Sequence, residues 1–199
     1  MANPAGTILE RPSPWTGIFT PGAHGNVGSD VPVVITPLRD VSAVSVIARK
    51  DAKLPAINGL DVPAMGRWVA NDTMRIASDG PNQWRVTSNG TAEGDLYRDV
   101  KAALGTTASV IDQSHGWVNV EIMGPTSPDV LAKGSSVDFH LDQFGAGQCA
   151  ATQIHHMMVH VTCLDEDGPR YAFQLFRSMA GSFANWLRDS SAEFGCRIE

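Results

Sequence analysis

The sequence lacks the features of several large classes of protein. Its 15 basic residues form no cluster and its net charge is −6, so no surface is predicted for nucleic acid or anionic membranes. No apolar run approaches the roughly 20 residues that cross a bilayer, and the first residues do not resemble a secretory signal. Neither glycine-rich phosphate-binding pattern occurs. We expect a soluble protein with no nucleotide site of its own.

Cysteine is also scarce, with only Cys149, Cys163 and Cys196 in the chain. Three is an odd number, and the spacing does not resemble that of a metal site, so we expect free thiols in a reducing compartment, the cytoplasm. Cys149 has no basic neighbour in the sequence that would lower the pKa of its thiol. It is therefore interpreted as a small core residue.

Regular structure is expected to be sparse in residues 1–40, which hold half of the chain's 12 prolines. This N-terminal arm is nevertheless too apolar for a flexible linker, because it contains Trp15, Ile18 and Phe19. It packs either on its own domain or on a partner protein. On the second alternative, deleting residues 1–35 weakens assembly more than it weakens the fold.

Alternating and helical patterns follow the arm. Trp117 to Met123 alternates, with Val118, Val120 and Ile122 on the buried face of a strand. Ser127 is expected to cap a short helix that ends at a left-handed Gly134, and a second long strand is expected over Gln153 to Cys163. Other predicted elements are strands over Val41–Ala48, Met74–Ala77, Trp84–Thr87 and Tyr171–Leu175, a helix over Leu96–Leu104 capped by Asp95, and a closing helix from about Ser178 with Met179, Phe183, Trp186 and Leu187 buried.

This order of elements predicts an α+β fold in which helices cover one face of mixed, mainly antiparallel sheets. We divide the chain into the arm, residues 1–40, a smaller N-terminal lobe over 41–104, and a C-terminal lobe over 105–199.

The histidines are the most obvious candidates for a metal site. His155, His156 and His160 fall in one expected strand, where His156 and His160 share a face but lie roughly 13 Å apart at about 3.3 Å per residue. Nitrogen ligands lie only about 2 Å from a zinc ion, so two side chains at that spacing do not share one. We expect structural or interface histidines.

Other polar groups are interpreted as structural for similar reasons. Asp112, Ser114 and His115 are too close in sequence to form a catalytic triad, which gathers from distant segments, so a side-chain-capped turn is expected. The helix start after Gly124 contains two prolines and therefore lacks two of the amides that would bind an anion. Trp117 lies opposite the buried face of its strand, so either a second layer or a partner covers it.

Several blocks of the sequence resemble the gamma subunit of heterotetrameric sarcosine oxidase. The blocks are DQSHG at 112–116, IMGPTSPDVLAKG at 122–134, VDFHLDQF at 137–144, GQCAATQIHH at 147–156, GPNQWRV at 80–86 and RSMAGSFANWL at 177–187. The resemblance covers about residues 43–195. Because gamma subunits are similar to the folate-binding portion of glycine-cleavage T-proteins, the resemblance implies that architecture here.

The resemblance also implies a function. The complex demethylates sarcosine with oxygen and yields glycine, hydrogen peroxide and, with tetrahydrofolate, 5,10-methylenetetrahydrofolate. FAD, FMN and NAD belong to the alpha and beta subunits and zinc to the delta subunit. The gamma chain is therefore expected to be an accessory partner of those three. We predict no catalytic, cofactor-binding or metal-binding residue on it.

Two alternatives remain open at this stage. The first is a free-standing folate-binding or aminomethyltransferase-like protein, which needs an acidic residue for the pterin and a basic residue for the glutamate tail. Asp138 and Arg170 are candidates, although no motif selects them. The second is a regulatory protein that binds no ligand.

Overall fold

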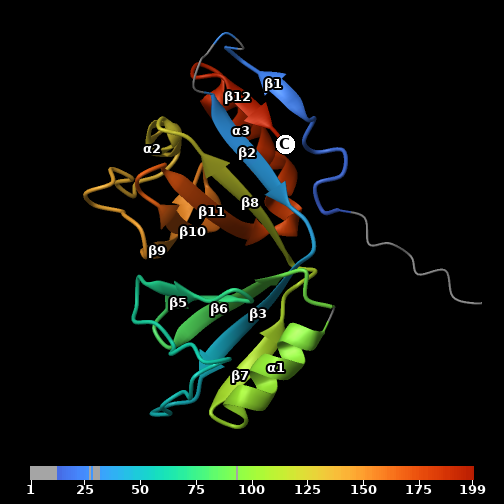
Figure 1. Ribbon diagram of the computed structural model, residues 1–199, viewed down its shortest axis with the longest axis vertical. Helices are drawn as coiled ribbons and strands as arrows, with labels where there is room; N and C mark the ends of the chain where they lie inside the picture. The colour runs from blue at the N-terminus through green and yellow to red at the C-terminus, as the bar shows by residue number, and fades with distance from the viewer. Residues whose placement is uncertain (1–12, 27, 29–31, 93) are drawn as a thin grey trace, which may run out of the picture.

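A computed structural model describes residues 13–26, 28, 32–92 and 94–199. In these ranges the strands form a seven-stranded sheet and a five-stranded sheet, which make the upper and lower halves of Figure 1. We call the half with seven strands the large lobe and the other the small lobe. The predicted α+β class with mainly antiparallel sheets is confirmed.

The small lobe is one continuous segment of the chain. The helix α1 lies along its sheet (Figure 1) and buries Leu96, Val100 and Leu104 against Val44 and Val86. Gly94 and Gly105 flank the helix, and both have positive φ. Asp95 is therefore not the cap but the first helical residue, where its charge favours the helix dipole. In sheet order the elements are β4 (Trp68–Ala70), β5 (Arg75–Gly80), β6 (Gln83–Asn89), β3 (Val41–Ala48) and β7 (Ala108–Asp112), with α1 at Asp95–Leu104.

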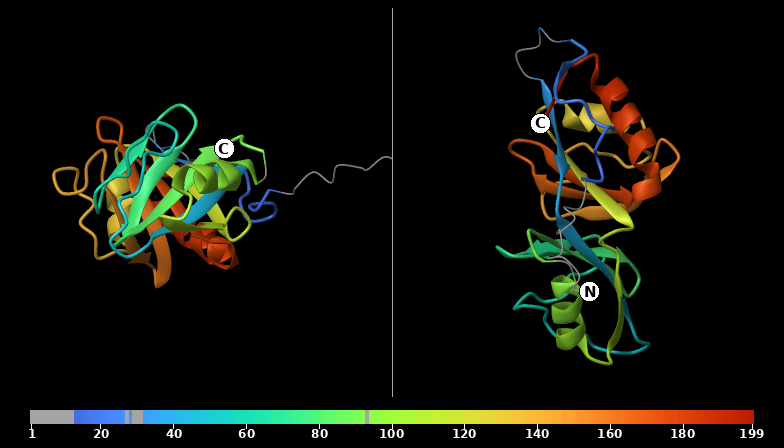
Figure 2. Two further views of the ribbon diagram at one scale, coloured as in Figure 1. Left: turned by 90° about the horizontal axis from the view of Figure 1, so that it is seen from below. Right: turned by 90° about the vertical axis from the view of Figure 1, so that its right-hand side faces the viewer.

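The large lobe is built from both ends of the chain. Its core lies between the sheet and the helix α3, which runs beside the sheet in the right-hand view of Figure 2 and contributes Phe183 and Leu187. In sheet order the strands are β1 (Gly22–His24), β12 (Cys196–Ile198), β2 (Val33–Leu38), β8 (Trp117–Met123), β11 (Arg170–Phe176), β10 (Met157–Asp165) and β9 (Cys149–Ile154). The helices are α2 (Ser127–Ala132), the 3₁₀ turn η1 (Arg177–Met179) and α3 (Ala180–Ser191).

The prediction of an arm with little regular structure is wrong for the residues described. β2 pairs in parallel with β12 on one side and antiparallel with β8 on the other, and Val33 and Ile35 are fully buried. Pro37 is tolerated because it follows Ile35↔Ile198, the last pair with β12, where that side of the strand is open. Trp15 is buried in the same lobe, and its indole N–H donates to the carbonyl of Asn119 at 2.9 Å. Residues 1–12 lie outside the described ranges.

The observed sheets also divide the chain differently from the expected boundaries. β2 comes from the supposed arm but belongs to the large lobe, and β7 lies beyond residue 104 but belongs to the small lobe. The small lobe therefore runs from β3 to β7, and the chain crosses between the lobes twice, at 39–40 and at 113–116.

The expected long strand over Gln153 to Cys163 is in fact a hairpin of β9 and β10. His155 and His156 form its turn, with φ of 46° and 67°, in the left-handed region that glycine, asparagine and aspartate usually occupy. The three histidines therefore do not share one strand, and the spacing argument made from the sequence does not apply.

The ends of α2 and α3 differ from the predictions by a residue or two. Thr126 occupies the cap position of α2, and Ser127 is its first residue. Gly134 is not left-handed but lies against Trp186, where a Cβ would sit 2.5 Å from the indole ring. Met179 belongs to η1 and is exposed, whereas Phe183, Trp186 and Leu187 are buried as predicted.

The two faces of β8 explain how the lobes meet. Val118, Val120 and Ile122 face the core of the large lobe as predicted. Trp117 and Glu121 point the other way, yet each is only 7% exposed. The small lobe provides part of this cover, because its Arg85 lies over the Trp117 ring. Trp117 is therefore covered, at least in part, by the small lobe of the same chain.

Candidate functional site: the cleft between the lobes

A seam of hydrogen bonds joins β4 and β5 of the small lobe to β10 of the large lobe. The Nε2–H of His160 donates to the carbonyl of Ser78 at 2.8 Å, and the indole N–H of Trp68 donates to the carbonyl of Cys163 at 2.9 Å. His160 is buried there, and burial lowers the pKa of its imidazole to about 4, with the nearby Arg85 acting in the same direction. The seam is therefore built around a neutral histidine.

Arg85 is a charged residue of the small lobe that contacts the large lobe at the seam. Its guanidinium pairs with Asp79 at 2.9 Å within the small lobe, donates to the Oε1 of Gln174 at 3.2 Å, and lies 4.2 Å from the centroid of the Trp117 ring. Gln174 and Trp117 belong to the large lobe, so this one side chain joins the lobes by a hydrogen bond and a cation–π contact.

Replacing Arg85 by alanine is expected to lower the free energy of unfolding by about 2–4 kcal/mol, because Asp79 loses its partner and Trp117 loses its cover. Urea unfolding of the full chain measures the change. Arg49→Ala is the matched control, because Arg49 is exposed and is expected to alter stability by less than about 0.5 kcal/mol. Equal effects of the two variants would show that the contacts of Arg85 do not stabilise the chain.

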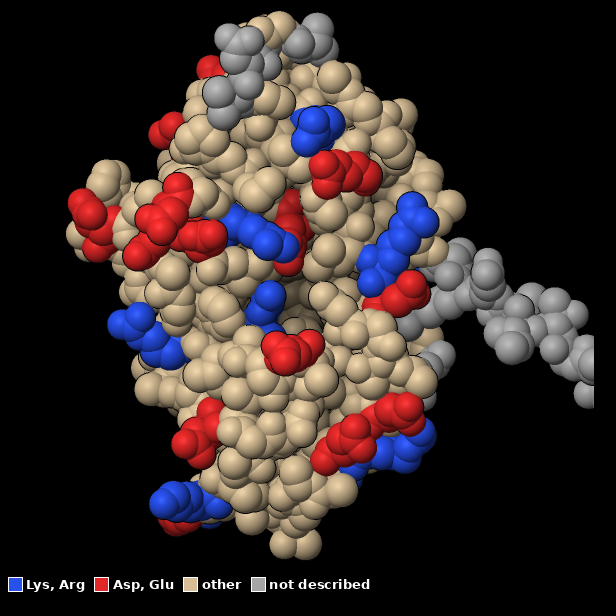
Figure 3. Space-filling view, in the orientation of Figure 1, with Lys and Arg blue, Asp and Glu red and all other residues tan. Residues whose placement is uncertain are grey.

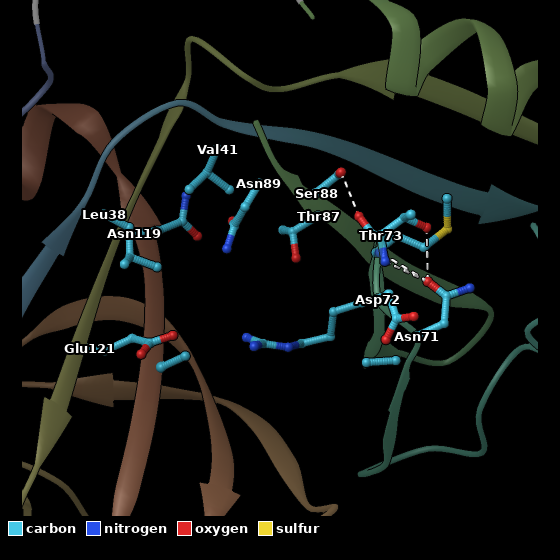
Figure 4. Close-up of a pocket in the computed structure, with 14 residues that line it drawn as sticks. Leu38, Val41, Asn71, Asp72, Thr73, Thr87, Ser88, Asn89, Asn119 and Glu121 are labelled. Carbon is cyan, nitrogen blue, oxygen red and sulfur yellow. Dashed lines mark hydrogen bonds between the residues drawn. The ribbon is translucent and has the colours of Figure 1, made fainter. Parts of the chain in front are cut away.

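Beside the seam, the surface between the lobes is hollowed, and acidic and basic side chains meet there (Figure 3). The hollow is a cavity of about 130 Å³ between β8 and β11 of the large lobe and β5 and β6 of the small lobe. Figure 4 shows Asn119 and Glu121 on one side of it, with Thr87 and Asn89 of β6 reaching in from another. The lining residues are Leu38, Val41, Ala70–Arg75, Thr87–Asn89, Asn119, Glu121 and Ala172.

Three charged groups define the electrostatics of the cleft. Glu121 is buried, and its Oε2 accepts hydrogen bonds from both Nε and Nη2 of Arg170, the former at 2.8 Å. Arg75, the first residue of β5, lines the same cavity, and its guanidinium lies 5.3 Å from the centroid of the Trp68 ring. Burial lowers the pKa of Arg75, the charge of Glu121 opposes that shift and the charge of Arg170 adds to it. The cleft thus contains one matched ion pair and one further cation, and the exposed Asp72 also belongs to its lining.

Local hydrogen bonds hold the loop before β5 on the rim of the cleft. The Oδ1 of Asn71 accepts from the backbone N–H groups of Thr73 and Met74, each at 3.0 Å. The Oγ of Ser88 donates to the carbonyl of Thr73 at 2.6 Å, which ties the loop to β6 (Figure 4). Arg75 follows this loop directly, so its backbone position is well defined.

The candidates chosen from the sequence lie elsewhere. The Oδ1 of Asp112 accepts from the backbone N–H of Ser114 at 2.9 Å, and the Oγ of Ser114 bonds to the backbone of Ala43, so the predicted capped turn is confirmed. His155 and His156 stand at the hairpin turn. Within the described ranges, no group of three or more His, Cys, Asp or Glu side chains is placed to hold a metal ion.

Asp138 and Arg170, the pair considered for folate, are not brought together. Asp138 is exposed and accepts a hydrogen bond from the backbone N–H of His140, whereas Arg170 pairs with Glu121 at the cleft. The three cysteines are free thiols, as predicted, and all three are buried. Burial raises the pKa of each, most clearly that of Cys163, to about 11. The structure also contains, in its described ranges, no helix that is long and apolar enough to span a bilayer.

The two-lobed arrangement is shared with solved structures. A chain of heterotetrameric sarcosine oxidase from Corynebacterium sp. U-96, solved in complex with pyrrole 2-carboxylate, has a TM-score of 0.78 and 19% sequence identity over 92% of this chain and 96% of its own length. The glycine cleavage system aminomethyltransferase T from Bartonella henselae has a TM-score of 0.64 and 12% identity, and it covers 85% of this chain and 48% of its own length. At these identities the likeness establishes the fold, which is that of the aminomethyltransferase type, as predicted.

A family model then identifies the family within this fold. The model described as "Sarcosine oxidase, gamma subunit family" matches residues 46–193, well over half of the chain. The chain therefore belongs to the sarcosine oxidase gamma subunit family, as the resemblance implied. No curated protein sequence matches the chain significantly.

Proposed function

We propose that this chain is the accessory gamma subunit of a heterotetrameric sarcosine oxidase and carries none of the catalytic residues of the complex. Its partners are the alpha, beta and delta subunits, which hold FAD, FMN, NAD and zinc, and the assembly works in the cytoplasm. The complex oxidises the N-methyl group of sarcosine with oxygen, and the products are glycine, hydrogen peroxide and, with tetrahydrofolate, 5,10-methylenetetrahydrofolate.

The observation that carries this proposal is the family match over residues 46–193. The sequence supports the proposal that the partner subunits, and not this chain, hold the cofactors. It contains no glycine-rich loop through which backbone amides approach the phosphates of a flavin or a dinucleotide. Oxidation by oxygen needs an electron carrier, which protein side chains do not supply. A chain without a flavin loop therefore suits a structural role.

Exposed apolar side chains fit a subunit that is covered in a complex. Phe176 and Met158 are each 50% exposed, and Phe176 lies opposite Trp117 across neighbouring strands. Ile111 and Met179 are also exposed. Apolar side chains that gather on a surface often mark contacts with other proteins. We expect partner subunits to bury some of these side chains.

Assembly tests the proposal. Tagged full-length chain, expressed together with alpha, beta and delta subunits of a sarcosine oxidase, is expected to co-purify with all three in fixed stoichiometry. The complex is expected to release peroxide from sarcosine. Purification of the tagged chain free of all three partners, while those partners assemble an active enzyme without it, would contradict an accessory role.

The chain purified alone is expected to be colourless, to bind neither FAD nor FMN, and to release no peroxide from sarcosine, because it has no loop for a flavin phosphate. The visible spectrum and a peroxide assay measure this, with the assembled complex as positive control. Visible absorbance that corresponds to about one bound flavin per chain would overturn the proposal. Release of peroxide from sarcosine in the absence of partners would also overturn it. Micromolar binding of tetrahydrofolate to the lone chain would instead favour a folate-binding protein.

A further inference from the structure

We propose that the cleft between the lobes binds a small carboxylate, and that Arg75 is the residue that holds it. The proposed function assigns no ligand to this chain, so this site goes beyond it. The site is a binding site and not a catalytic one, because the cleft presents no nucleophile paired with a general base.

The first step of the argument is the state of the Arg75 guanidinium. Its Nε is fully enclosed, and within the described ranges no oxygen accepts a hydrogen bond from it. The guanidinium makes a cation–π contact with the ring of Trp68. An arginine carries five N–H donors, and leaving such donors unpaired in a partly buried position costs free energy. A carboxylate fits the planar fork of a guanidinium through two parallel hydrogen bonds, so it is the natural partner.

The charges around Arg75 favour an anion over a cation. Glu121 is the nearest acidic group in the interior, but it is already paired with Arg170, and both hydrogen bonds from that arginine go to its Oε2. This pair is close to neutral as a unit. Asp72, the other acidic residue of the lining, is exposed. The positive charge of Arg75 is therefore the uncompensated charge inside the cleft.

The walls of the cavity supply further hydrogen-bond donors. The side chains of Thr87, Asn89 and Asn119 point into the cavity from two strands of different lobes (Figure 4). None of the three forms a side-chain hydrogen bond to another described residue. Hydroxyl and amide groups placed in this way can bind a carboxylate oxygen that faces away from Arg75. The ligand would then contact both lobes at once.

The size of the cavity limits what can enter. About 130 Å³ holds several water molecules or a small organic anion. Pockets for drug-sized ligands and cofactors are typically about 300–1,000 Å³. A compact monocarboxylate therefore fits the part of the cleft beside Arg75.

Ligand-observed NMR tests the site with acetate as the probe, on the full-length chain, together with its partner subunits if it is purified with them. Saturation transfer from the protein to the acetate methyl group is expected to be saturable. Acetamide, which has the same shape without the charge, is expected to bind at least about tenfold more weakly, because the charge-assisted bonds are lost.

Two substitutions locate the binding. Arg75→Gln is expected to weaken acetate binding at least about tenfold, and Arg75→Lys, which keeps the charge but not the fork, is expected to weaken it less. Arg49→Gln is the matched control and is expected to bind as the wild type does, because Arg49 is exposed in the small lobe away from the cleft lining. Circular dichroism establishes that each variant is folded.

Any of three results would overturn the proposal. The wild type does not bind acetate, it binds acetate and acetamide with equal affinity, or the affinity for acetate is the same in Arg75→Gln as in the wild type. If Arg75→Gln does not fold, the comparison of acetate with acetamide on the wild type still tests whether the chain prefers a carboxylate. Binding is measured without sarcosine turnover. A chain that binds acetate through Arg75 but does not assemble with partners would contradict the proposed function and leave this inference standing.

Discussion

A chain that begins at residue 36 is expected to lose the folded large lobe. The deletion removes Trp15, Val33 and Ile35, which are buried in the core of that lobe, and it removes the part of β2 that separates β8 from β12. Loss of one large buried side chain costs about 2–5 kcal/mol. Three such losses, together with an unpaired strand, are comparable with the whole stability of a typical domain, about 5–15 kcal/mol.

Circular dichroism and thermal melting measure the outcome. We expect the truncated chain to show no cooperative melting of the large lobe, and its failure to assemble would then be a consequence of unfolding. Ile35→Ala is a milder version and is expected to lower the free energy of unfolding by about 2–5 kcal/mol. Arg39→Ala is the control, because Arg39 is exposed. If the truncated chain melts as the full chain does but no longer binds partners, the first residues serve assembly alone and the packing argument is wrong.

Acidification from pH 6.5 to pH 4 is expected to cost the protein about 3 kcal/mol of stability through His160 alone. Burial lowers the pKa of this imidazole from the ordinary 6.5 to about 4 in the folded chain. The unfolded chain therefore binds a proton between these values and the folded chain does not, so the stabilisation is complete above pH 6.5 and is lost as the pH falls towards 4. Arg85 and Arg75 face the ring and also lower its pKa, whereas Asp79 raises it.

Urea unfolding at a series of pH values between 4 and 7 measures this contribution. His160→Gln keeps a neutral donor for the carbonyl of Ser78 and is expected to flatten the profile between pH 6.5 and 4. His140→Gln is the control, because His140 is exposed and is expected to leave the slope unchanged. An identical slope in wild type and His160→Gln would mean that other groups cause the acid sensitivity.

The sequence predicted best those strands in which apolar residues alternate with less apolar ones. β8 and β11 agree with the prediction, because Val118, Val120, Tyr171 and Phe173 alternate with less apolar neighbours. β2 was not predicted, because the many prolines of residues 1–40 argue against regular structure, whereas only a short apolar run between Pro32 and Pro37 indicates a strand. The density of prolines in a segment does not show which side of a strand remains unpaired, and only that side tolerates a proline.

The turn at His155 and His156 carries no sequence signal of the usual kind. Two-residue hairpin turns normally use glycine, asparagine or aspartate, because these residues adopt positive φ at low cost. Two histidines in this conformation are stabilised by the pairing of β9 and β10 around them. Tertiary pairing therefore fixed a backbone that local preference does not predict.

The cleft could not be predicted because its residues meet only when the lobes dock. Arg75 and Glu121 lie on strands of different sheets, and nothing in the spacing along the chain gives the register of one sheet against the other. A weak signal was present in β8, where Glu121 interrupts a strand that is otherwise mostly apolar. A buried charged residue at such a position indicates a partner of opposite charge, here Arg170, which is 49 residues away.

The two crossings of the chain between the lobes set the order in which the molecule can be completed during synthesis. Every strand of the five-stranded sheet lies between Val41 and Asp112, so that sheet needs no residue beyond 112. The seven-stranded sheet needs β12, which ends at Ile198 and stands between β1 and β2. Until β12 has left the ribosome, β2 and β8 have no complete sheet to join. The small lobe can thus fold before synthesis reaches the large lobe's later strands. The large lobe can complete its sheet only when both β2 and β12 have been made.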